Sequence, residues 1–316
     1  VEALLQKPQN PDSTDAYARS PLTVASSAGH IDIVRLLLEA GADKDLANTD
    51  GITALMISSR HGRLEVVRLL LEADADKVGA NKDVADTDGD TALIAASRRG
   101  QLEAERLLLE DFANNKGDNA LMIASRHGHL EVVRLLLEAG ADKDVANTDG
   151  ITALMIASQH DLLVARLLLE VGADKDFANT DGITALMIAS QRGYLGAVRL
   201  LLEVGANKDV ADTDGDTALI AASRRGQLEA ARLLLEAGAD KDFANNKGDN
   251  ALMIASRHGH LEVVRLLLEA GADKDVANTD GITALMIASR HGHLEVVRLL
   301  LEADAEDLPT LTASLP

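Results

Sequence analysis

The feature that most constrains this chain is a segment of about 33 residues that recurs along nearly its whole length. Residues 150–158 read Gly-Ile-Thr-Ala-Leu-Met-Ile-Ala-Ser, and near-copies follow at intervals of 33, 38, 28, 33, 32, 33, 33 and 33 residues. We number the copies one to nine by the residue at the Thr152 position: Ser20, Thr53, Thr91, Asn119, Thr152, Thr184, Thr217, Asn250 and Thr283. Self-similarity at this period predicts a repeat architecture in which each unit packs only against its neighbours.

Each copy has the pattern of two short helices and a loop. The nine markers are all Ser, Thr or Asn, which cap helix starts by accepting a backbone N–H bond. A helix of about eight residues should follow, as in 54–61, and a glycine such as Gly62 should end it. A second helix is predicted over 130–138, with Leu130, Val133, Leu136 and Leu137 on one face. Gly140 then supplies a left-handed C-cap, and 141–150 forms a turn-rich extended loop.

Composition fits such an array and excludes several classes of protein. The chain is 47% hydrophobic but only 2% aromatic, so its core must be built from small aliphatic side chains; Ala153, Ala157 and Ser158 would let neighbouring helices approach closely. The net charge of −20 is spread along the repeats, because five central units counted separately carry between 0 and −3. This charge argues against a nucleic-acid partner. No apolar run is long enough to insert into a membrane.

Targeting signals and cysteines give a few further expectations. No secretory signal pattern is present, so we expect an intracellular location, cytoplasmic or organellar. The lack of cysteine excludes disulfides and says little about compartment. The first residue is Val1 rather than Met, which indicates a processed or partial chain.

Over essentially its whole length the chain resembles the ankyrin repeat family. The resemblance rests on the 33-residue period, the Gly-x-Thr-x-Leu helix start, the turn at 128–131 and the Leu-Leu-Leu-Glu-x-Gly-Ala-Asp ending at 135–142. The family's Thr-Pro-Leu-His becomes Thr-Ala-Leu-Met or Thr-Ala-Leu-Ile here, and only the first repeat keeps a proline, Pro21. The resemblance implies an all-α solenoid, elongated and curved, with a helix-turn-helix and a β-hairpin loop per repeat. We assign residues 1–16 to a partial N-terminal repeat, 17–307 to nine repeats and 308–316 to a C-terminal tail.

The resemblance also implies a role in protein binding, through hairpin tips and the inner helices of the concave face. The inner positions are the two residues before each helix-breaking glycine, or the equivalent pair in repeat five: Arg60 and His61, Arg98 and Arg99, Arg126 and His127, Gln159 and His160, Gln191 and Arg192, Arg224 and Arg225, Arg257 and His258, and Arg290 and His291. Beside them run the tips: Asp50, Asp88, Lys116, Asp149, Asp181, Asp214, Lys247 and Asp280. One hypothesis is that this largely cationic column contacts acidic or polar groups of a partner. The alternative is that each Arg pairs with tip Asp residues of its own or the next repeat.

The second helix carries an arginine at one position in all nine repeats, and a glutamate follows each four residues later. A ladder of solvated helix-surface pairs is the simplest interpretation. These arginines are Arg35, Arg68, Arg106, Arg134, Arg166, Arg199, Arg232, Arg265 and Arg298.

Two irregularities break the period. Five extra residues lie at 73–77, and five residues are missing after Glu110. One interpretation is a functional loop that projects beside a shortened one; the other is a trace of recombination, tolerated because loops accept changes in length at little energetic cost. Repeat five lacks one residue of its turn, and because Asp tolerates the left-handed conformation better than most residues, we expect Asp161 to adopt it in a kinked but intact turn. A longer duplication relates repeats about four apart and permits two like binding surfaces.

No sequence pattern in the chain supports a metal-binding or catalytic site. Three His-Gly-His triplets would need convergent partners to bind zinc, and the Asp-rich loops lack the ligand pattern of calcium loops. No phosphate-binding loop, cysteine nucleophile or serine elbow is present. We therefore expect no catalytic, metal or cofactor site and no enzyme activity. The leading hypothesis is a non-catalytic protein-binding scaffold. A structural or accessory subunit of a large assembly, and a regulatory segment of a longer multidomain protein, are the alternatives.

Overall fold

The computed structural model describes residues 10–71, 82, 84–108 and 116–303, and within these the side chains of residues 105–107 are not described. Residues 1–9 of the predicted partial N-terminal repeat, the 73–77 insertion, the gap after Glu110, the Arg106 side chain and the 308–316 tail lie outside the described residues. The chain divides into two compact units, Val1–Ala153 and Leu154–Pro316, and each is considered by itself.

The described residues contain eighteen helices in consecutive antiparallel pairs, as the repeat pattern predicts. The first helices of the pairs are α1 (Pro21–Ala28), α3 (Ala54–Arg60), α5 (Ala92–Ser97), α7 (Ala120–His127), α9 (Ala153–Ala157), α11 (Ala185–Arg192), α13 (Ala218–Arg225), α15 (Ala251–His258) and α17 (Ala284–His291). The second helices are α2 (Ile31–Glu39), α4 (Leu64–Leu71), α6 (Leu102–Leu108), α8 (Leu130–Glu138), α10 (Leu162–Glu170), α12 (Leu195–Glu203), α14 (Leu228–Glu236), α16 (Leu261–Glu269) and α18 (Leu294–Glu302).

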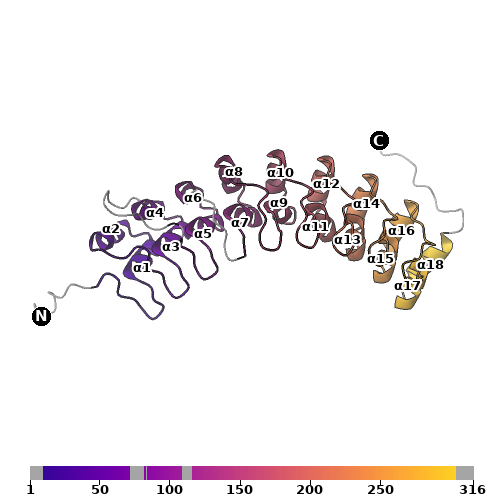
Figure 1. Ribbon diagram of the computed structural model, residues 1–316, viewed down its shortest axis with the longest axis horizontal. Helices are drawn as coiled ribbons and strands as arrows, with labels where there is room; N and C mark the ends of the chain where they lie inside the picture. Colours follow the sequence, from indigo (N-terminus) through magenta and orange to yellow (C-terminus); the bar gives the residue numbers. More distant parts are fainter. Residues whose placement is uncertain (1–9, 72–81, 83, 109–115, 304–316) are drawn as a thin grey trace, which may run out of the picture. The chain divides into compact units, whose positions relative to one another are not determined.

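Within each unit the pairs stack in sequence order and form two layers. The odd-numbered helices from α1 to α7 pack on one another, and so do those from α11 to α17; the even-numbered helices form a second row. Figure 1 shows the hairpin loops extending from the odd-numbered side, so we call the odd-numbered helices inner and the even-numbered ones outer. In the described helices none is long and apolar enough to span a bilayer.

Capping residues begin the inner helices where the sequence predicts. The side chain at the marker accepts a backbone N–H bond in seven of the described helices; Asn250, for example, accepts from Met253 N at 3.0 Å. Gly128 and Gly259 follow the inner helices with φ of 70° and 71°, and Gly140 follows an outer helix with φ of 93°. The predicted helix starts and left-handed stops are therefore confirmed.

The core is made of small aliphatic side chains, as the composition predicts. Ala153, Ala157 and Ser158 are each 1% exposed. On α8 the buried residues are Val132, Val133 and Leu136, whereas Leu130 and Leu137 are only half-buried. The buried face of α8 therefore includes Val132, which the sequence pattern did not predict. The reason is that α8 packs both against its own inner helix, α7, and against the neighbouring outer helix, α6.

Two local predictions were wrong. Asp161 has φ −145°, in the extended region, and caps α10 by accepting from Leu163 N at 2.8 Å and Val164 N at 3.1 Å. A cap is possible without a left-handed residue because the turn is one residue shorter. Where an outer-helix arginine forms an ion pair among the described residues, its partner is the acid three residues before it rather than the glutamate four after, as with Arg134 and Glu131.

The same pairing recurs on three further outer helices: Arg232 with Glu229, Arg265 with Glu262 and Arg298 with Glu295. Helical side chains lean toward the N-terminus, so an arginine reaches back to the preceding turn.

Candidate functional site

The hairpin tips are fixed by side-chain turns and by bonds between successive hairpins. Asn147 Oδ1 accepts from Asp149 N at 3.0 Å and Ile151 N at 2.9 Å, which closes the tip. Thr148 N and Thr148 Oγ1 both donate to Lys116 O of the preceding hairpin, at 3.2 Å and 2.9 Å. Equivalent backbone bonds run from Thr87 to Asp50, Thr213 to Asp181, Asn246 to Asp214 and Thr279 to Lys247. Within each unit the tips are thus held at a regular spacing.

All eight predicted tip residues are exposed. They carry six carboxylates and two ammonium groups: Asp50, Asp88, Lys116, Asp149, Asp181, Asp214, Lys247 and Asp280.

At the ends of the inner helices, the second residue of each predicted pair is exposed in every described repeat. These residues are His61, Arg99, His127, His160, Arg192, Arg225, His258 and His291. Stacking of the inner helices places them in a column within each unit, next to the hairpins. This part of the predicted column is available for contact.

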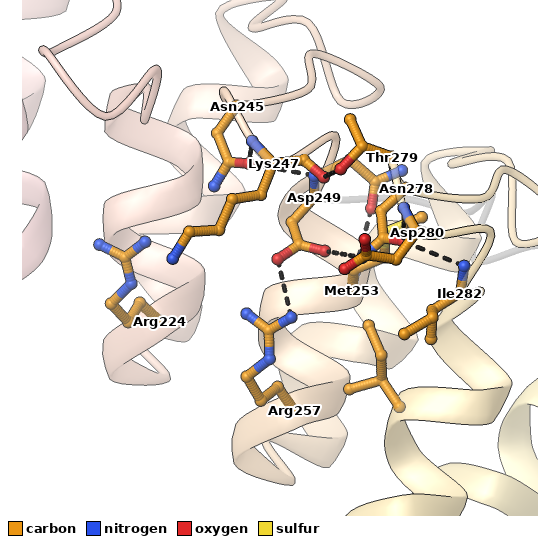
Figure 2. A network of polar contacts seen from close by, with 12 residues as sticks. Arg224, Asn245, Lys247, Asp249, Met253, Arg257, Asn278, Thr279, Asp280 and Ile282 are labelled. Atoms are coloured by element: carbon orange, nitrogen blue, oxygen red, sulfur yellow. Dashed lines mark hydrogen bonds and ion pairs between the residues drawn. The ribbon is translucent and has the colours of Figure 1, made fainter.

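The first residue of each pair has a different environment, shown for one repeat in Figure 2. Arg257 donates from Nη2 to Asp249 Oδ2 at 2.7 Å, and the Asp249 side chain is only 1% exposed. The other carboxylate oxygen of Asp249 accepts from Asn278 Nδ2 of the next hairpin at 2.8 Å. A buried carboxylate thus joins an inner helix to the following repeat.

This arrangement occurs in four repeats. Arg98 pairs with Asp90, Arg126 with Asp118 and Arg224 with Asp216, and all three carboxylates are buried. Asp118 and Asp216 also accept from Asn147 and Asn245 of the next hairpins, at 2.7 Å and 2.8 Å. The hypothesis that inner arginines are paired within the array is therefore correct for these four, but the acid is the residue before the helix cap, not the tip Asp.

Among repeats two to nine, the other four have isoleucine at the position where these four have aspartate. The isoleucines are Ile52, Ile151, Ile183 and Ile282, and the residues eight positions later are Arg60, Gln159, Gln191 and Arg290. Among the described residues, neither Arg60 nor Arg290 makes an ion pair. The column therefore mixes tethered arginines, unpaired arginines and neutral amides.

The turns between inner and outer helices bind successive repeats together. Nε2 of His260 donates to Arg224 O at 3.2 Å, and His293 makes the same bond to Arg257 O at 3.0 Å. These bonds satisfy carbonyls at a helix end, which have no partner inside the helix. The second histidine of each His-Gly-His triplet thus has a structural role. Partial desolvation and the neighbouring His260 lower the pKa of His258.

Two pockets lie between hairpin tips and inner helices, one in each unit. The first has a volume of about 380 Å³ and includes Arg60, Arg99, Asp50 and Asp88 in its lining. The second, of about 180 Å³, is lined by Lys247, Asp280, Ile282, Arg290 and His291, with other neighbours. Both combine exposed charges of either sign with an isoleucine, so they can bind polar and apolar groups side by side. The described residues contain no cluster of three or more potential metal ligands.

The sequence interpretation therefore found the exposed column and the tips but missed the buried groups that tether part of it. The missed residues are Asp90, Asp118, Asp216 and Asp249, together with the amides Asn147, Asn245 and Asn278. A usable signal existed, because each aspartate lies eight residues before an arginine, and the repeats with isoleucine break that pattern.

Comparison with known families gives one result. A model of ankyrin repeats, three copies long, matches residues 1–81, 78–147, 140–212, 201–278 and 237–309. A comparison with curated proteins found no match.

Proposed function

Since this chain belongs to the ankyrin repeat family, whose repeats generally mediate protein–protein interaction, we propose that it is a non-catalytic scaffold that binds proteins through its inner-helix ends and hairpin tips. The family is typically non-catalytic. The binding surface of the proposal comprises the exposed second residues of the inner pairs and the tips beside them.

The observation that carries the proposal is the contrast between the two residues of the pair in the four described repeats whose first residue is tethered to a buried aspartate. Arg224 is held by the buried Asp216, whereas Arg225, the next residue, is exposed. The same contrast separates Arg98 from Arg99 in the other unit. A cation that is already paired with a buried acid is poorly available for an ion pair with a partner protein. We therefore expect the exposed residues to make the contacts that recognise the partner.

The lining of the pockets supports a partner surface of mixed charge. In the first pocket Arg60 and Arg99 lie with the tip carboxylates Asp50 and Asp88. Complementary charges of both signs improve specificity and association rate more than raw affinity. We therefore expect the partner to present acidic and basic groups together rather than one uniform charge.

The test uses the full chain immobilised and exposed to a protein extract of its source organism. Arg99→Glu and Arg225→Glu together should reduce the recovery of specific partners by about tenfold, as expected for residues at the centre of an interface. Arg232→Glu, on the outer helix α14, is the matched control and should leave recovery unchanged. The proposal is refuted if the wild type, the Arg99→Glu/Arg225→Glu variant and the Arg232→Glu control recover the same partners equally, while circular dichroism shows unchanged helicity.

A further inference from the structure

The outer helices α10 and α12 depart from the rest of the array at one position. The second residue of an outer helix is acidic in seven of the nine repeats: Asp32, Glu65, Glu103, Glu131, Glu229, Glu262 and Glu295. In α10 and α12 it is Leu163 and Gly196. Both helices lie in the same unit and pack against each other.

Apolar side chains are exposed at this place. Leu163 is 60% exposed and Leu162 is 40% exposed. Tyr194 in the turn before α12 is 44% exposed. Leu162 also packs over the backbone of α12, since a Cβ on Gly196 would lie 2.8 Å from Leu162 Cδ2. The three side chains Leu162, Leu163 and Tyr194 are termed the α10–α12 patch.

Tyr194 replaces a residue that elsewhere joins neighbouring repeats. At this turn position His260, Gln227 and Arg63 each donate a hydrogen bond to a main-chain carbonyl in the inner helix of the preceding repeat. Tyr194 makes no such bond among the described residues. Its ring therefore adds exposed apolar surface at a position where other repeats have a side chain that is hydrogen-bonded to the neighbouring repeat.

Two exposed arginines on the same two helices also lack ion-pair partners among the described residues. Arg232, Arg265 and Arg298 pair with the acid three residues before them. Arg166 and Arg199 have Leu163 and Gly196 at that position, are exposed, and form no ion pair among the described residues.

We propose that the α10–α12 patch, with Arg166 and Arg199, is a second docking surface, which binds a peptide segment of a partner protein that carries an apolar side chain next to a carboxylate. The patch lies on outer helices and their turns, so it is separate from the hairpin tips (Figure 1). Exposed apolar side chains near a rim of charge are characteristic of interaction sites. The two unpaired guanidinium groups select a carboxylate, because they match it in charge and planar geometry.

The array itself provides the variants for a test. Leu163→Glu and Tyr194→His restore residues that other repeats carry at the same positions, so the stack should fold. Arg166→Gln and Arg199→Gln remove the charges alone. The controls change the same positions in later repeats: Gln227→His at the Tyr194 position one repeat on, and Glu229→Gln at the Leu163 position two repeats on.

The probe is a random peptide display library selected on the full chain. Peptides that bind the wild type but not Leu163→Glu/Tyr194→His should pair an apolar residue with Asp or Glu. For the best of these, fluorescence polarisation should show a loss of about tenfold in affinity in Arg166→Gln/Arg199→Gln, and no change in the two controls. Arg225→Glu should also leave this affinity unchanged, so this proposal and the proposed function can fail separately.

Three results would overturn the proposal. One is a selection in which all recovered peptides bind the restored variant as well as the wild type. Another is a set of discriminating peptides that lacks acidic residues. The third is binding to phosphatidylserine vesicles that the Arg166→Gln/Arg199→Gln variant abolishes, which would assign the patch to a membrane surface.

Discussion

Replacing Arg257 by alanine is expected to destabilise the α15–α16 repeat far more than its partial exposure indicates. The Arg257 side chain is 32% exposed, but the side chain of its partner Asp249 is 1% exposed and would be left as a buried carboxylate. Removing one member of a buried pair costs about 3–5 kcal/mol. Asn278 keeps its bond to Asp249, and water can reach the space vacated by Arg257, so we expect about 2–3 kcal/mol.

The same chain offers a control and a rescue. Arg290→Ala changes an exposed arginine with no ion pair in the described residues and should cost no more than about 0.5 kcal/mol. Asp249→Ile with Arg257→Gln recreates the combination at Ile183 and Gln191, and should cost only about 1 kcal/mol because Asn278 loses one acceptor.

Urea denaturation would measure the total free energy of unfolding, and hydrogen exchange of the α15 and α16 amides would locate the change. The reasoning fails if Arg257→Ala and Arg290→Ala are equally stable, or if the double variant is less stable than Arg257→Ala.

Three further predictions test individual contacts. Gly259→Ala should destabilise the chain by more than about 1 kcal/mol, because φ is 71° and a Cβ would lie 2.6 Å from His293 Nδ1. In Gly271→Ala the new Cβ would meet only Lys241 Cε, at 3.8 Å, so a thermal melt should show a smaller loss of stability. Asp161→Ala should lower the free energy of unfolding by about 0.5–2 kcal/mol, because it removes the α10 cap. Asp161→Asn should retain most of that stability, so equal melting temperatures for the two variants would contradict the capping role. His258 has a pKa below its ordinary value of 6.5, so the unfolded chain binds more protons and stability should fall as the pH drops below about 6.5. Urea melts across this range should show a shallower pH slope for His258→Gln, and an unchanged slope would rule out this contribution.

Much of the fold could be predicted from residue types at fixed spacing. Caps at Ser20, Asn119 and Asn250 and the glycine that follows every inner helix except α9 fix helix boundaries through local backbone geometry alone. The resemblance to the ankyrin repeat family is confirmed by the family-model matches. Local rules were less reliable at Asp161, where turn length decided between a left-handed residue and a cap.

The candidate surface was harder to predict because its properties depend on the next repeat. Arg290 and Arg257 occupy the same position of their inner helices, yet Arg290 makes no ion pair among the described residues and Arg257 is tied to a buried acid. Their difference comes from Asp249, which a hairpin of the following repeat covers. A list of arginines therefore overstates the number of cations available to a partner.

The sequence by itself determined the period, the helix starts and stops and the small-residue core, because each depends on residues within one repeat or on a side chain's size. Only the tertiary structure decided which charges are free. Whether an arginine is available depends on a carboxylate eight residues before it in the same repeat. That carboxylate accepts from an amide 29 residues further along the chain, which only the stacking of the next repeat brings within hydrogen-bond distance.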